Sequence, residues 1–273
     1  MRTGEFHSYH GVKGNINVYN PVVKEGSSYA VIYVMNGADE KLNSITTGWM
    51  TDGSQKTGCF NIACPGFVQV DKRVYSGSPI SNVYIPNGPQ FEIGLSISKA
   101  EDGNWWVTKD QINIGYFPAK IFNNFVDPET VDWGGIVVSP PNGISPPMGS
   151  GIFPDDNYKH TSQFRAIQYR NSSGVLDGPH KYTYDTIIDS PNCYLIDFHG
   201  YIGLVPISSL VPRVVEAMDR DGSSFIGMYG FIGVAVLIVK TPLDIAAANS
   251  KHLSARHGRA LFIALTSFLG SSL

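Results

Sequence analysis

Short runs in which polar and apolar residues alternate, separated by turn residues, recur along most of the chain. Alternation is clear over 15–19, 90–98 and 163–169, and each run predicts a β-strand with one buried face. The run 28–35 is apolar almost throughout, which favours a central strand covered on both faces, and Asn36-Gly37 ends it with turn chemistry. The first two thirds of the chain are therefore predicted to be rich in antiparallel β-structure.

Two further strands are predicted to carry special features. In the strand 42–50, Thr46 and Gly48 share one face because successive side chains point to opposite sides. The strand 131–138 contains a Gly-Gly pair directly after Trp133. Glycines weaken a strand, so the pair predicts either a bulge or a place where another backbone or a ligand comes close; a kinked core strand is the simpler interpretation.

Helical patterns are rare in this sequence. Residues 120–125 are the one short helical candidate in the first two thirds. Near the C-terminus, 225–239 is apolar throughout but shorter than the roughly 20 residues of a spanning helix, and 261–269 is weakly helical in pattern. The expected fold is all-β, an antiparallel sandwich or barrel, with a poorly ordered or helical C-terminal tail.

Composition narrows the function. The chain has 273 residues, of which 16% are charged, with a formal net charge of −3 and no basic run. These values argue against a nucleic-acid-binding protein, because such proteins neutralise phosphates with clustered Lys and Arg. The 29 glycines and 17 prolines agree with many short strands joined by tight turns, in one large domain or two smaller ones.

Motifs for the commonest enzyme chemistries are missing from the sequence. It contains no Ser-His-Asp elbow, no phosphate-binding loop, no dinucleotide fingerprint and no cluster with metal-ligand spacing. The seven histidines are scattered. We therefore expect no cofactor and no metal, and nothing in the sequence indicates an oligomeric state.

The cysteines and one asparagine are candidate sites of covalent chemistry. Cys59 and Cys64 are close enough to close a small loop by a disulfide, which would leave Cys193 unpaired; three reduced core cysteines are the alternative. Asn171 begins an Asn-Ser-Ser triplet and is a glycosylation candidate, although such triplets are common by chance.

Several motifs in one order carry a resemblance to a known family. They are Gly58-Cys59-Phe60-Asn61, Cys64-x-Gly66-Phe67-Val68-Gln69, Gly103-Asn104-Trp105-Trp106, Gly115-Tyr116-x-Pro118, Trp133-Gly134-Gly135, Met148-Gly149-Ser150-Gly151-x-Phe153 and Asn192-Cys193-Tyr194. Together they resemble the plant neprosin family of glutamic peptidases. The resemblance runs over about 9–194, and 195–273 is a divergent apolar tail outside the family pattern.

The resemblance implies a β-sandwich of two antiparallel sheets and a peptidase that cuts after proline at acid pH. Its substrates would be proline-containing peptides, and its members are typically secreted. Two glutamates on one cleft would activate a water, one as general base and one as general acid. Paired carboxylates suit this chemistry, because like charges held close raise the pKa of one of them.

Both glutamate positions differ in this chain. The family motif Asn-Ser-Ile-Glu-x-Gly-Trp has Thr46 in place of its glutamate, and Ile136 follows Gly-Gly where the second glutamate belongs. Neither side chain transfers protons usefully. Asp132 lies four residues before Ile136 and would share its face in a regular strand, but at a distance that disfavours substitution for the lost group.

The chain departs from the family at three other places. Family sequence of about the length of a strand pair is missing between Met50 and Thr51, and the family's partner for Cys193 is absent, so this cysteine is expected to be unpaired. No apolar run follows Met1, so we expect no signal peptide and leave the location open. An aberrant transcript or gene model would also account for these differences.

Two classes of function follow. The first is a neprosin-like protein that has lost catalysis. The second is a non-enzymatic peptide- or glycan-binding sandwich, with a membrane tether through 225–239 as a less favoured addition. In the second case the ligand would stack on cleft aromatics, although a place in the core is the simpler role for each; the candidates are Trp49, Trp105, Trp106, Tyr116 and Trp133.

Overall fold

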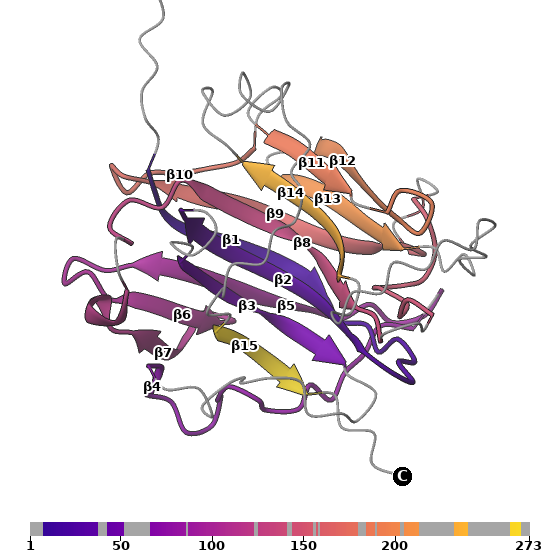
Figure 1. Cartoon of the computed structure of the whole chain (residues 1–273), viewed down its shortest axis with the longest axis horizontal. Helices are drawn as coiled ribbons and strands as arrows, with labels where there is room; N and C mark the ends of the chain where they lie inside the picture. Colours follow the sequence, from indigo (N-terminus) through magenta and orange to yellow (C-terminus); the bar gives the residue numbers. More distant parts are fainter. Residues whose placement is uncertain are drawn as a thin grey trace, which may run out of the picture.

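Two β-sheets packed face to face form the protein (Figure 1). The structure is a computed structural model, and it describes residues 8–37, 43–51, 66–85, 87–122, 125–140, 144–154, 157, 159–179, 184–188, 190–202, 205–212, 232–239 and 263–268. The expected all-β sandwich is confirmed.

The first sheet is antiparallel throughout, in the order β12-β13-β9-β1-β5-β6-β7-β4, with β10 paired to β9. Its strands are β1 (Tyr9–Asn17), β4 (Val68–Gln69), β5 (Glu92–Lys99), β6 (Trp105–Lys109), β7 (Ile112–Phe117), β9 (Ser162–Asn171), β10 (Leu176–Asp177), β12 (Tyr194–Ile202) and β13 (Val205–Pro212).

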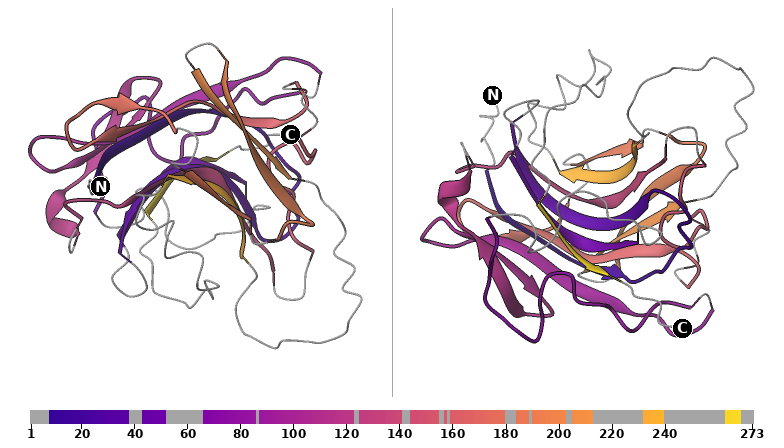
Figure 2. Two further views of the ribbon diagram at one scale, coloured as in Figure 1. Left: turned by 90° about the horizontal axis from the view of Figure 1, so that it is seen from above. Right: turned by 60° about the horizontal axis from the view of Figure 1, so that its bottom comes forward.

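The second sheet has the order β11-β14-β8-β2-β3-β15, and all of its pairs are antiparallel except β15 with β3. Its strands are β2 (Ser27–Asn36), β3 (Asn43–Thr51), β8 (Thr130–Val138), β11 (Tyr184–Ile188), β14 (Ile232–Val239) and β15 (Ile263–Phe268). Seen from above, the two layers curve in the same sense, so that one nests against the other (Figure 2).

Three local expectations are corrected by the structure. The helical candidate at 120–125 reduces to the 3₁₀ turn η3 (Ala119–Ile121). Parts of the two apolar C-terminal runs form strands β14 and β15, not helices. An unbroken apolar run alone does not distinguish a buried strand from a helix. Here the runs are strands because β14 pairs with β8 and β15 pairs with β3. Within the described ranges, no helix has the length and apolar character needed to cross a membrane.

The Gly-Gly pair in β8 forms no bulge. Residues 130–138 pair with β2 in one unbroken register, so the strand keeps strict alternation. The group that comes close is a core side chain, neither a backbone nor a ligand: a Cβ on Gly135 would lie 2.1 Å from Sδ of the buried Met148. The glycine therefore makes room for a core methionine.

Two tryptophans of the second sheet bond to the main chain of the first. Nε1–H of Trp133 donates to the carbonyl of Lys13 at 2.8 Å, and Nε1–H of Trp49 donates to the carbonyl of Asn17 at 2.8 Å. Both acceptors lie on β1, and both indoles are fully buried. These bonds fix the second sheet relative to the first while satisfying the one polar atom of each indole.

We predict that Gly135→Ala lowers the free energy of unfolding by about 1–3 kcal/mol, because the new methyl group overlaps Met148. Urea denaturation measures the change. Combined with Met148→Ala, the substitution should cost less than the sum of the two single effects, since the cavity receives the methyl group. Strictly additive losses would contradict this packing.

Candidate functional site

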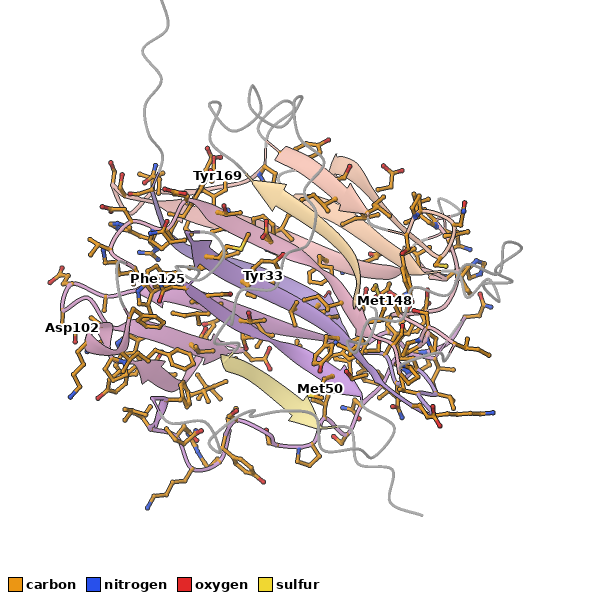
Figure 3. The ribbon with its side chains drawn as sticks, in the orientation of Figure 1. Tyr33, Met50, Asp102, Phe125, Met148 and Tyr169 are labelled. Carbon is orange, nitrogen blue, oxygen red and sulfur yellow. The ribbon has the colours of Figure 1, made fainter. Side chains whose placement is uncertain are left out.

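Alternate residues of β2, β3 and β8 point away from the core and form the outer face of the second sheet. A small apolar cluster covers part of it, with Tyr29, Val31 and Met50 buried and Ile136 packed against them. Val34, Trp49 and Val131 on the opposite side of the same strands belong to the main core. Tyr33 and Met50 are labelled in Figure 3.

Strand pairing arranges this face in cross-strand rows. One row reads Thr46, Tyr33 and Asp132, the next Gly48, Val31 and Gly134, and the next Met50, Tyr29 and Ile136. Thr46 and Ile136 therefore flank β2 on either side, two rows apart. From standard strand dimensions this offset is about 13 Å along the strands and about 10 Å across them.

Neither of these two positions offers a titrating group. Thr46 is only 4% exposed, and its hydroxyl lies 3.4 Å from Oγ of Ser44. Ile136 is half-buried in the apolar cluster. Both side chains suit a pleated, closed surface because they are β-branched.

Asp132 is the carboxylate that β8 places on this face, and it is 0% exposed. It lies directly opposite Tyr33 on β2, so the phenol and the carboxylate share this face as neighbours. Burial and the nearby charge of Asp132 raise the pKa of the Tyr33 phenol well above its ordinary value. The phenol therefore stays protonated beside the carboxylate.

The five candidate aromatic residues do not meet in one cleft. Trp49, Trp105 and Trp133 are fully buried in the core between the sheets. Trp106 and Tyr116 face outward from the first sheet and contact each other, with ring centroids 4.9 Å apart. Adjacent residues in a strand point to opposite faces, which explains why Trp105 and Trp106 separate.

The candidates for covalent chemistry lie elsewhere. Cys59 and Cys64 are outside the described residues, and Cys193 is a half-buried free thiol. Asn171 ends β9, where its Oδ1 accepts from the backbone N–H groups of Ser173 and Val175, both at 3.0 Å. Among the residues that the structure describes, no group of His, Cys, Asp or Glu side chains could hold a metal ion.

Comparison with protein families gives one match over more than half of the chain. Residues 46–203 match the model of the family described as Neprosin. The chain belongs to the neprosin family. Its match begins at Thr46 in β3 and ends just after β12, so it includes β8, most of β3 and most of the first sheet, whereas β1 and β2 lie before it.

The neprosin motifs retained here make packing contacts with one another. A Cβ on Gly115 would lie 2.5 Å from the ring of Phe67, so that glycine admits the ring, as Gly135 admits Met148. The side chain of Asn104 accepts from the N–H of Ala119 at 3.0 Å and closes the connection after β7. These motifs therefore specify how the sandwich packs.

Gln69, the last residue of one motif, organises the loop that follows β4. Its Nε2 donates to the carbonyls of Asp71 and Ile114, at 2.7 and 3.0 Å, and its Oε1 accepts from the N–H of Ser76 at 3.2 Å. Sequence reasoning missed both this role and the partner of Asp132. The family motif marked Gln69 as a residue of interest. Nothing in the sequence marks Tyr33 as the neighbour of Asp132, because that depends on the strand register.

We predict that Tyr33→Phe lowers the free energy of unfolding by about 1–3 kcal/mol, because it removes the hydroxyl that faces a buried carboxylate. Tyr75→Phe is the matched control, since Tyr75 is exposed and should change stability by less than about 0.5 kcal/mol. Urea denaturation of both variants measures the difference. Equal stability of the two variants would show that Asp132 does not depend on the phenol.

Proposed function

We propose that this neprosin-family protein has lost the glutamic peptidase activity that the resemblance implies and acts as a binding module. The observation that carries the proposal is the pair Thr46 and Ile136, which stand at the two glutamate positions of otherwise matching motifs. General acid–base catalysis needs groups that gain and lose protons near the working pH. A threonine hydroxyl and an isoleucine side chain do neither.

The geometry of Asp132 supports this proposal. It lies four residues from Ile136 on the same strand, about 13 Å away, whereas a misplacement of about 1 Å already costs up to roughly a hundredfold in rate. Its carboxylate is shielded from solvent and lies opposite Tyr33. A general base must instead contact the attacking water.

The preserved packing motifs favour a folded, functional binder over a remnant of an enzyme. The buried indoles of Trp49 and Trp133 still tie the sheets together, and Met148 still fills the space above Gly135. Proline-containing peptides are the ligand class that the family resemblance implies, whereas glycans are the ligand class that the outward-facing, half-buried Trp106 and Tyr116 suit.

We predict that the folded protein does not cleave a fluorogenic peptide after proline at acid pH, and that Asp132→Asn leaves this result unchanged. Thr46→Glu/Ile136→Glu tests whether only the acid–base pair is missing, with Thr46→Gln/Ile136→Gln as the matched uncharged control. Thermal melts establish that each variant is folded. Cleavage by the unmodified protein that disappears in Asp132→Asn would overturn the proposal and make Asp132 the surviving acid.

A further inference from the structure

The outer face of the first sheet carries a continuous cross-strand row that the peptidase resemblance does not use. Strand pairing places seven residues side by side across β10, β9, β1, β5, β6, β7 and β4. In spatial order they are Leu176, Arg170, Gly11, Ser98, Trp106, Tyr116 and Val68. Residues on either side of these in sequence, such as Val12, Ile97 and Val107, are core residues, so the row faces outward.

An aromatic platform lies toward one end of this row. The rings of Trp106 and Tyr116 are 4.9 Å apart and inclined by 35°, and Val68 beside them is 37% exposed. Both rings are only half-buried, in contrast to Trp105, which packs on Phe125 in the core. Indole and phenol rings combine a large apolar surface with a polar edge, which suits the apolar face of a pyranose ring.

Hydroxyl and amide groups surround the platform. Ser98 is next to Trp106 in the row, and the adjacent row on the same face reads Gln168, Lys13, Ser96 and Thr108. Ser96 and Thr108 are hydrogen-bonded to each other at 2.7 Å, which orders them across β5 and β6. Such small neutral polar groups match the hydroxyls of a sugar, since each can donate and accept.

The two rows around the platform carry positive charge. Arg170 and Lys13 are their charged residues, and both rows lack a carboxylate over the strands described. Two carboxylates lie farther along the face, and each has a cationic neighbour: Glu92 is 3.5 Å from Arg165, and Asp110 is 2.7 Å from Lys109. Arg170 and Lys13 thus add positive charge beside the aromatic platform of a protein whose net charge is −3.

We propose that the outer face of the first sheet binds an acidic polysaccharide built from uronic acid units. One pyranose ring stacks on Trp106 and Tyr116, and carboxylates farther along the chain pair with Lys13 and Arg170. Arg170 lies three strand spacings from Trp106, about 14 Å, so the ligand must extend over several sugar units. This assignment names the ligand class of the binding module proposed above.

Isothermal titration calorimetry tests the proposal with an oligogalacturonate and with the same oligomer methyl-esterified, which keeps the rings and removes the charge. We expect the acid to bind more tightly, and we expect the affinity to fall as salt rises. Trp106→Ala should weaken binding of both oligomers at least about tenfold. Lys13→Gln/Arg170→Gln should weaken only the acid, to the affinity of the ester, while the exposed pair Lys24→Gln/Lys72→Gln should leave both unchanged.

Three results would overturn the proposal: no binding of the acid by the folded protein, binding that Trp106→Ala does not change, or equal affinity of the unmodified protein for acid and ester. Thermal melts confirm that each variant is folded before titration. Thr46→Glu/Ile136→Glu should bind the oligogalacturonate like the unmodified protein, because those positions lie on the other sheet. The peptide-cleavage assay and the glycan-binding assay therefore test the loss of catalysis and the proposed ligand separately.

Discussion

Two indole hydrogen bonds set the position of one sheet against the other, and the rest of the sandwich depends on them. Trp49 of β3 and Trp133 of β8 both reach across the core to carbonyl groups of β1. The pairing of β1 with β9 shifts register between Lys13 and Asn15, beside the carbonyl that accepts from Trp133. A bulge of this kind leaves main-chain groups available, and a buried indole needs one acceptor. The core is thus specified by polar geometry as well as by apolar volume.

That constraint acts on the inner faces only, which explains why the outer face of the second sheet is free to change. Thr46 and Ile136 contact neither indole bond, so their identity does not affect how the sheets meet. The face that they occupy is largely closed to solvent, with Tyr29, Val31 and Met50 buried. Two glutamates there would have to be desolvated, which lowers the stability of the fold. An active site keeps such destabilising groups because catalysis needs them, whereas a binding scaffold does not need them. Threonine and isoleucine are the more stable choice on such a surface.

The strands of this fold could be predicted from the alternation of polar and apolar residues, because each strand has one buried face. Alternation also places Trp105 and Trp106 on opposite sides, so their different roles follow from their being neighbours in one strand. The row of Thr46, Tyr33 and Asp132 could not be predicted, since it depends on the register of β2 with β3 and with β8, and β8 is distant in sequence. The apolar runs near the C-terminus were ambiguous for a related reason: their state depends on which strand edges they pair with.

Asp132 shows how burial decides what a carboxylate does. It lies on the face where the family resemblance expects acid–base chemistry, and it is an ionisable group of the right class. Catalysis would require it to contact water and substrate, whereas here solvent is excluded and the Tyr33 phenol is its neighbour across the strand pair. A buried carboxylate is tolerated when polar neighbours compensate for the lost hydration. The burial beside Tyr33 that makes Asp132 compatible with the fold therefore also keeps it from transferring protons. A carboxylate that remains on this face is thus no evidence that the activity remains.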